Sequence, residues 1–104
     1  MHRTLPALLA TPLLAACGYK QDDFAADYAE AWCQVWADCE LLDVIDYESA
    51  DECRAVVEPT RQEDHCADYD MQMAQECIDG ILAMTCDDLY DEAPWPSACD
   101  SACE

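Results

Sequence analysis

The nine cysteines among the 104 residues are the side chains with the widest choice of chemistry. Cysteine thiolates can bind metals or exchange disulfides, and sites of either kind usually contain a Cys-x-x-Cys spacing. The closest pair in this chain is Cys99-x-x-x-Cys103, so that spacing is absent. Such a high cysteine content in a short chain is typical of structural disulfides formed in an oxidising compartment. The cysteines therefore predict an exported, disulfide-stabilised protein.

Eight of the nine cysteines come after Cys17 in the sequence. An even number of cysteines can pair completely. The eight that we expect to form four disulfides are Cys33, Cys39, Cys53, Cys66, Cys77, Cys86, Cys99 and Cys103. The sequence does not choose among their possible pairings. We expect a Cys39–Cys53 bridge, because Cys39 ends one predicted helix and Cys53 lies in the first turn of the next.

A run of acidic residues after Cys86 is the strongest candidate for a metal site. Asp87, Asp88, Asp91 and Glu92 offer the carboxylate oxygens that Ca²⁺ prefers. Asp88, Asp91 and Glu92 would share one helical face, where their mutual repulsion is costly unless cations screen it. We expect a solvated face and no cofactor. Binding of calcium or another divalent cation stays open as the alternative.

His65 is the only histidine after the first sixteen residues. Next to Cys66 it gives weak support for a zinc site, which needs four converging ligands. Hydrolysis by a serine nucleophile needs a base and an oriented third group, and no glycine-rich elbow surrounds any serine of this chain. We therefore expect no catalytic residue and a protein that is not an enzyme.

The N-terminus has the order of a secretory signal: Arg3 in a short basic start, an uncharged run to Ala16, and then Cys17. This run is too short and too rich in proline for a permanent membrane span. The tetrapeptide Leu14-Ala15-Ala16-Cys17 resembles the lipobox of bacterial lipoproteins. The resemblance implies a diacylglyceryl thioether on Cys17 and cleavage immediately before it. An ordinary signal that leaves Cys17 as a thiol is the alternative, and the even number of remaining cysteines disfavours it.

The lipobox resemblance divides the chain into a signal peptide at 1–16, a lipidated tether at 17–23 and a cysteine-rich acidic domain at 24–104. Gly18 follows Cys17. In the lipoprotein family aspartate at that position typically retains the protein at the inner membrane, so the resemblance implies the outer membrane. Acyl chains would anchor the protein in the cell envelope without spanning the bilayer. Whether the domain faces the periplasm or the cell surface stays open.

The chain carries 24 acidic and 4 basic residues, for a formal net charge of −20. A charge of this size excludes a polyanionic partner such as nucleic acid. It predicts an unknown protein or other cationic partner, in addition to the membrane reached through the lipid anchor. The expected function is therefore non-enzymatic: an anchored, exported protein that presents a disulfide-stabilised acidic surface.

Apolar residues recur at helical spacing in three segments of the chain. The first segment, 24–39, forms one helical stripe that we expect in the core and that consists of Phe24, Tyr28, Trp32, Val35, Trp36 and Cys39. A binding platform made of Tyr28, Trp32 and Trp36 is the alternative. Ser49 and Glu52 have the form of a capping box and predict a second helix. We expect that helix to bury Cys53, Val56 and Val57 and to end near Glu58, because Pro59 disfavours helical geometry in the preceding residue.

Asp70 can cap a third helix from 71 to about 83. Its expected buried stripe consists of Ala74, Cys77, Ile78, Ile81 and Leu82, and Gly80 weakens this prediction modestly. Thr85 can begin a short fourth helical turn, and Trp95 between two prolines is the best candidate for an exposed aromatic residue. The predicted fold is mainly α, a small disulfide-stapled bundle of three to four short helices.

The order of these landmarks resembles a group of small cysteine-rich bacterial lipoproteins of unknown function. The residues that carry the resemblance are Trp32-Cys33 in the first helix, Tyr69-Asp70 at the cap of another, and the interval from Cys77 to Cys86. The resemblance implies the same helical architecture and adds nothing about mechanism.

Overall fold

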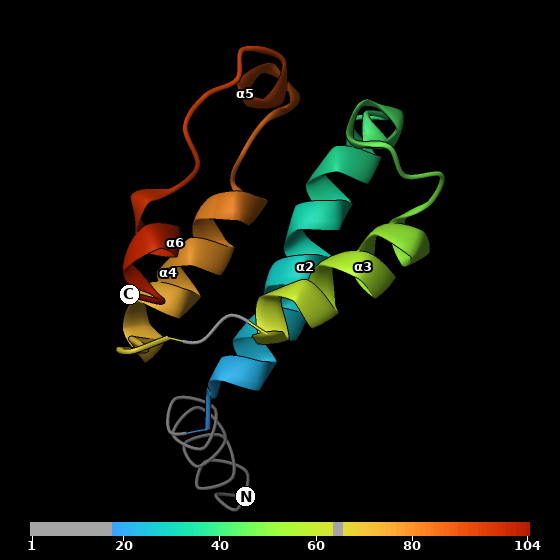
Figure 1. Cartoon of the computed structure of the whole chain (residues 1–104). Helices are drawn as coiled ribbons and strands as arrows, with labels where there is room; N and C mark the ends of the chain where they lie inside the picture. The colour runs from blue at the N-terminus through green and yellow to red at the C-terminus, as the bar shows by residue number, and fades with distance from the viewer. Residues whose placement is uncertain (1–17, 64–65) are drawn as a thin grey trace, which may run out of the picture.

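The computed structural model describes residues 18–63 and 66–104, and all the regular elements in these ranges are helical. The elements are α2 (Gln21–Asp38), the 3₁₀ helix η1 (Leu42–Ile45), α3 (Ala50–Glu63), α4 (Met71–Leu82), α5 (Cys86–Tyr90) and α6 (Ser97–Ser101). Figure 1 shows α2 between α3 on one side and the pair α4 and α6 on the other, with α5 at one end of the molecule. The mainly α, disulfide-stapled fold predicted from the sequence is confirmed, and the five-residue helix α6 is an addition to it.

Helix α2 is central because it buries two stripes. Ala25, Ala29 and Cys33 recur at intervals of four and are buried, and Cys33 is bonded to α3. Phe24 and Val35 belong to a second cluster that includes residues of α4 and α6. Small residues on both stripes let the neighbouring helices approach closely. α2 begins at Gln21, inside the segment expected to be a tether, because Asp22 and Asp23 favour the first turn of a helix.

In the stripe predicted for α2, Phe24 and Val35 are buried, and Tyr28 and Trp36 pack against the core cluster while remaining partly exposed. Tyr28, Trp32 and Trp36 are only half-buried. They lie at i, i+4 and i+8, a row that runs along the edge of the packed faces. The small residues Ala25, Ala29 and Ala31 of α2 are buried, whereas the large aromatic rings remain partly accessible along one side.

Helix α3 begins as predicted, with the Glu52 amide donating to Ser49 Oγ at 3.1 Å. The predicted end at Glu58 is wrong, because the helix continues through Pro59 to Glu63. Pro59 removes the hydrogen bond to the carbonyl of Ala55, a residue that is exposed. The last turn is held in place by Arg61, whose guanidinium lies 4.3 Å from the centroid of the Tyr28 ring.

Val56 of α3 is also a correction, since 49% of its surface is exposed, whereas Cys53 is fully buried as expected. The two residues are three positions apart and diverge by about 60° around the helix. α3 packs against α2 through the face that carries Cys53, and Val56 lies outside this contact.

Helix α4 is capped by Asp70, whose Oδ1 accepts a hydrogen bond from the Met73 amide at 3.0 Å. Ala74, Cys77 and Ile81 are completely buried, and Ile78 is half-buried against them. Leu82 was expected in the core but is 56% exposed. It lies one residue beyond Ile81, a rotation of about 100° away from the face that contacts α2 and α6.

Gly80 of α4 has a low helix propensity but is needed for the packing of α4 against Pro96. A Cβ atom at this position would lie 2.7 Å from Cγ of Pro96. The proline ring is stiff and cannot move aside as a flexible side chain would. The absence of a side chain at Gly80 therefore allows the segment before α6 to pack directly onto α4.

The eight expected cysteines form four disulfides. The pairs, with their Cα–Cα distances, are Cys33–Cys53 (5.9 Å), Cys39–Cys86 (5.5 Å), Cys66–Cys103 (4.9 Å) and Cys77–Cys99 (4.6 Å). The expected Cys39–Cys53 bridge is wrong. The start of α3 is bonded to Cys33 within α2, while Cys39 at the end of α2 is bonded to the start of α5.

The C-terminal segment is fixed at both ends. Tyr69 and Cys103 form an antiparallel β-bridge, flanked by hydrogen bonds between the backbones of Asp68 and Glu104 at 2.9 and 3.1 Å. Ala102 is fully buried in the cluster between α2 and α4. Together with two disulfides, these contacts make α6 part of the core although it has only five residues.

Candidate functional site

The carboxylates after Cys86 are not brought together as a metal site. The Oδ2 atom of Asp88 accepts from the Thr85 amide at 2.8 Å, and the Asp88 amide donates to Thr85 Oγ1 at 3.2 Å. Asp88 is therefore used as the reciprocal cap of α5. Within residues 18–63 and 66–104, no group of three or more His, Cys, Asp or Glu side chains is placed to hold a metal ion. Asp87, Asp91 and Glu92 give the divalent-cation alternative no support from their arrangement.

The cysteine and histidine candidates divide into two groups. The eight cysteines from Cys33 to Cys103 are all consumed by the disulfides, so no thiolate of this set is available as a nucleophile or ligand. Cys17, the expected lipid site, and His65, the weak zinc candidate, lie outside the described residues.

Acidic side chains cover the described surface. Every Asp and Glu with a described burial is exposed, except the half-buried Glu58 and Asp88. The described basic residues are Lys20, Arg54 and Arg61; Arg54 pairs with Asp51 within α3, and Arg61 stacks on Tyr28. No described polar or charged residue is fully buried. The charge of the described residues is thus carried on the exterior.

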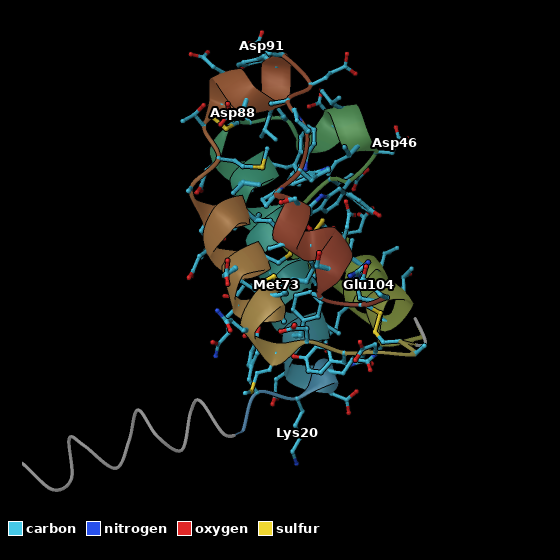
Figure 2. The ribbon with its side chains drawn as sticks, turned by 90° about the vertical axis from the view of Figure 1, so that its left-hand side faces the viewer. Lys20, Asp46, Met73, Asp88, Asp91 and Glu104 are labelled. Atoms are coloured by element: carbon cyan, nitrogen blue, oxygen red, sulfur yellow. A yellow bond between two sulfur atoms is a disulfide. The ribbon has the colours of Figure 1, made fainter. Side chains whose placement is uncertain are left out.

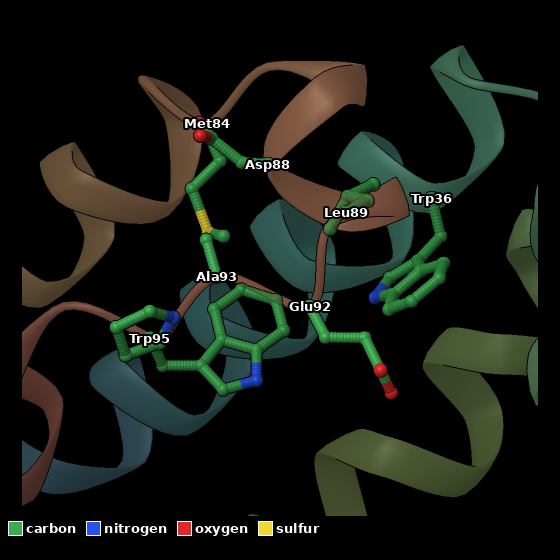
Figure 3. Close-up of a pocket in the computed structure, with 8 residues that line it drawn as sticks. Trp36, Met84, Asp88, Leu89, Glu92, Ala93 and Trp95 are labelled. Carbon is green, nitrogen blue, oxygen red and sulfur yellow. The ribbon is translucent and has the colours of Figure 1, made fainter.

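A pocket of about 350 Å³, which we call the tryptophan pocket, combines apolar and charged groups. Its lining includes Trp36 of α2, Met84, Leu89 of α5, Glu92, Pro94 and Trp95, with Asp88 at one edge (Figure 3). Leu89 is nearly buried beneath it, and the Cys39–Cys86 disulfide holds α5 over the end of α2. The pocket therefore depends on one covalent link between distant parts of the chain.

The three tryptophans of the chain form a continuous row at this pocket. The ring centroids of Trp32 and Trp36 are 6.0 Å apart, and those of Trp32 and Trp95 are 6.3 Å apart, both in tilted arrangements. Trp95 is 37% exposed, which confirms the expectation that this residue reaches the surface. Nε1 of Trp36 is buried with no hydrogen-bond partner among the described residues, and Figure 3 shows it turned toward the Glu92 side of the pocket.

Glu92 enters the pocket because of the way in which α5 ends. The Glu92 amide donates to the Leu89 carbonyl at 3.3 Å and the Ala93 amide to the Asp88 carbonyl at 2.9 Å, the pattern of a Schellman motif. The residue at this position has a left-handed conformation, and Glu92 adopts it with φ 54° where glycine is usual. Glu92 is exposed, and its carboxylate has no hydrogen bond or ion pair with any described side chain.

A second polar cluster lies at the opposite end of α2. The hydroxyl of Tyr19 donates to Asp27 Oδ2 at 2.9 Å, and the hydroxyl of Tyr69 donates to the Tyr19 carbonyl at 3.4 Å. Partial burial and the hydrogen bond to Asp27 raise the pKa of Tyr19 well above its ordinary value, and burial also raises the pKa of Tyr69. Both phenols stay protonated at neutral pH, and we interpret them as links that fasten the start of α2 to the segment before α4.

Comparisons with known proteins add no assignment to this geometry. Neither protein-family models, nor curated proteins, nor solved structures contain a match to the chain. Among the residues that the structure describes, no helix has both the length and the apolar character needed to cross a membrane.

Sequence reasoning identified Trp95 but missed the pocket around it. The sequence pattern places Trp36 in the core and predicts that Glu92 belongs to a solvated acidic face, with a role as a calcium ligand as the alternative. The signal that could have joined them is the Cys39–Cys86 pairing, because it brings the end of α2 to the start of α5. That pairing cannot be read from cysteine spacing alone.

Proposed function

We propose that the protein is a lipid-anchored, exported, non-enzymatic protein that presents an acidic surface to a cationic partner. The observation that carries the proposal is the exposure of almost every described acidic side chain in a chain of net charge −20. Charge of one sign on a rigid surface raises the rate at which oppositely charged partners associate and repels polyanions. Four disulfides supply the rigidity that a small domain with this much self-repulsion needs.

The anchor follows from the lipobox-like Leu14-Ala15-Ala16-Cys17 sequence. The pairing of the other eight cysteines among themselves supports it, because Cys17 then has no cysteine partner within the chain. A diacylglyceryl thioether with a further acyl chain would hold the mature chain firmly on a membrane. With Gly18 after Cys17, the outer membrane is the proposed location.

Replacing Cys17 with alanine should abolish acylation and release the chain from stable membrane attachment. Intact mass spectrometry of the membrane-extracted wild type should give residues 17–104 plus acyl chains, and reduction of its four disulfides should add eight hydrogens. The Cys17→Ala variant should lack the acyl mass. Gly18→Ala is the matched control and should keep it. An unacylated wild-type chain, or one with titratable thiols, would contradict the anchor.

Binding of a cationic partner should depend on charge and on salt. We expect the detergent-extracted protein to bind a hexa-arginine peptide and not hexa-citrulline, which has nearly the same shape without the charge. Raising the salt from about 0.05 to about 0.5 M should weaken binding by roughly tenfold or more, because exposed charges are screened over a few ångströms at high salt. Isothermal titration calorimetry measures both quantities. Equal binding of the two peptides, or no binding of either, would refute the cationic-partner proposal.

A further inference from the structure

We infer that the tryptophan pocket is the site at which a protein partner inserts a single lysine or arginine side chain. This inference rests on the proposed function and specifies which part of the acidic surface recognises the partner. Acidic residues are spread over the whole described surface, so charge alone does not select a place. The pocket combines a concave shape, two tryptophan rings and two carboxylate side chains in one place.

The apolar lining matches the stem of a long basic side chain. Met84, Leu89 and Pro94 offer aliphatic surface, and Trp36 and Trp95 offer aromatic rings. A volume of about 350 Å³ is at the small end of ligand pockets, which span roughly 300 to 1,000 Å³, and is suited to one side chain rather than a large ligand. Lysine and arginine bury their methylene stems against apolar surface and keep the charged group at the end free to meet an opposite charge.

The charges at the pocket select a cation. Its lining contains the carboxylates of Asp88 and Glu92 and no basic residue. Asp88 is occupied as the cap of α5, whereas the Glu92 carboxylate is exposed and has no partner among the described side chains. The faces of Trp36 and Trp95 also attract cations, most strongly for tryptophan among the aromatic residues. One lysine or arginine side chain can therefore contact the apolar lining with its stem, and the Glu92 carboxylate and the tryptophan rings with its charged group.

The position of the pocket favours a protein segment over the headgroup of a lipid. Figures 1 and 2 show α5, with Asp88 and Asp91, at the opposite end of the molecule from Lys20. Between these ends runs α2, whose 18 residues correspond to about 27 Å at 1.5 Å per residue. With Cys17 anchored, the pocket would lie at the end of the described domain opposite to Lys20, within reach of a partner in the surrounding compartment.

The experiment is a titration of the detergent-extracted protein with hexa-arginine, followed by tryptophan fluorescence. Because all three tryptophans of the chain belong to the row at the pocket, occupancy should change the emission of the wild type. Trp95→Ala and Glu92→Gln should each weaken binding by about fivefold, and Trp95→Phe should recover part of the loss because a smaller ring remains. Calorimetry on the same variants gives the affinities independently of the fluorophore that is removed.

Glu48→Gln is the matched control, since it removes one exposed carboxylate that is not part of the pocket. It should change the affinity by less than about twofold, as expected of an isolated surface charge. If Trp95→Ala and Glu92→Gln weaken binding no more than Glu48→Gln, the pocket is not the recognition site, although the cationic-partner proposal stands. If the wild type itself fails to distinguish hexa-arginine from hexa-citrulline, the proposed function fails and this inference fails with it.

Discussion

Replacing both Cys39 and Cys86 with alanine should lower the free energy of unfolding by about 4 kcal/mol. The disulfide joins residues 47 positions apart, the largest separation of the four, and the entropy lost by the unfolded chain grows with the length of the closed loop. Cys86 is exposed and Cys39 is half-buried, so the substitutions remove a covalent link and little buried surface. For a small domain whose total stability is on the order of 5–15 kcal/mol, this loss is large.

The same variant should loosen α5 and the tryptophan pocket before the rest of the fold. α5 has five residues and only one nearly buried side chain, Leu89, to hold it on α2 once the link is gone. Urea unfolding under non-reducing conditions measures the stability, and amide hydrogen exchange should become faster in residues 86–92 than in α2 or α4.

Tyr90→Ala provides the control for this experiment, because Tyr90 belongs to α5 and is 62% exposed. It should change the free energy of unfolding by less than about 0.5 kcal/mol. An unchanged urea midpoint in the double alanine variant would show that the Cys39–Cys86 link contributes no constraint. Uniform exchange across the chain would contradict the local role assigned to it.

Ile81→Ala should destabilise the protein by about 3 kcal/mol. Ile81 is fully buried in the cluster between α2 and α4, and truncation both removes favourable burial and leaves a cavity that the disulfide-bonded neighbours cannot fill. The next residue offers a matched comparison, because Leu82 has the same number of carbon atoms and is 56% exposed. Leu82→Ala should cost less than about 0.5 kcal/mol.

Thermal or urea unfolding of these two variants decides between two descriptions of α4. The sequence pattern predicts that both residues are buried, which requires similar large losses. The packing of α4 against α2 and α6 predicts a difference of more than about 2 kcal/mol between them. Similar losses of stability in the two variants would mean that a surface from outside this chain covers Leu82 in solution.

The caps show which parts of the fold could be predicted locally. Asp70 and Thr85 accept hydrogen bonds from the amides three residues later, and Ser49 does the same at α3. A capping side chain and its target lie within one turn, so the interaction depends on nothing distant in the chain. Pro59 is the counter-example, because the contact between Arg61 and Tyr28, across two helices, extends α3 beyond the residue at which local geometry favours its end.

The helix ends show a different limit of sequence reasoning. The chain has only two glycines, and the left-handed positions after α2 and α5 are occupied by Glu40 and Glu92. Glycine is the usual sequence signal for such helix ends, so ends without a glycine are difficult to predict from the sequence. At α5, this hidden turn is what carries the Glu92 carboxylate to the tryptophan pocket.

The amino-acid sequence by itself determined that the protein is mainly helical, where most helices begin, which cysteines pair as a set, and how much negative charge the chain carries. These properties depend on contacts within one or two turns or on simple counting. Only the tertiary structure decided that Cys39 bonds to Cys86, that Leu82 is exposed while Ile81 is buried, and that Trp36, Glu92 and Trp95 line one pocket. Several faces of α2 and α4 are apolar enough to be buried, and the close fit of small residues such as Ala29, Ala74 and Gly80 selects which of them meet.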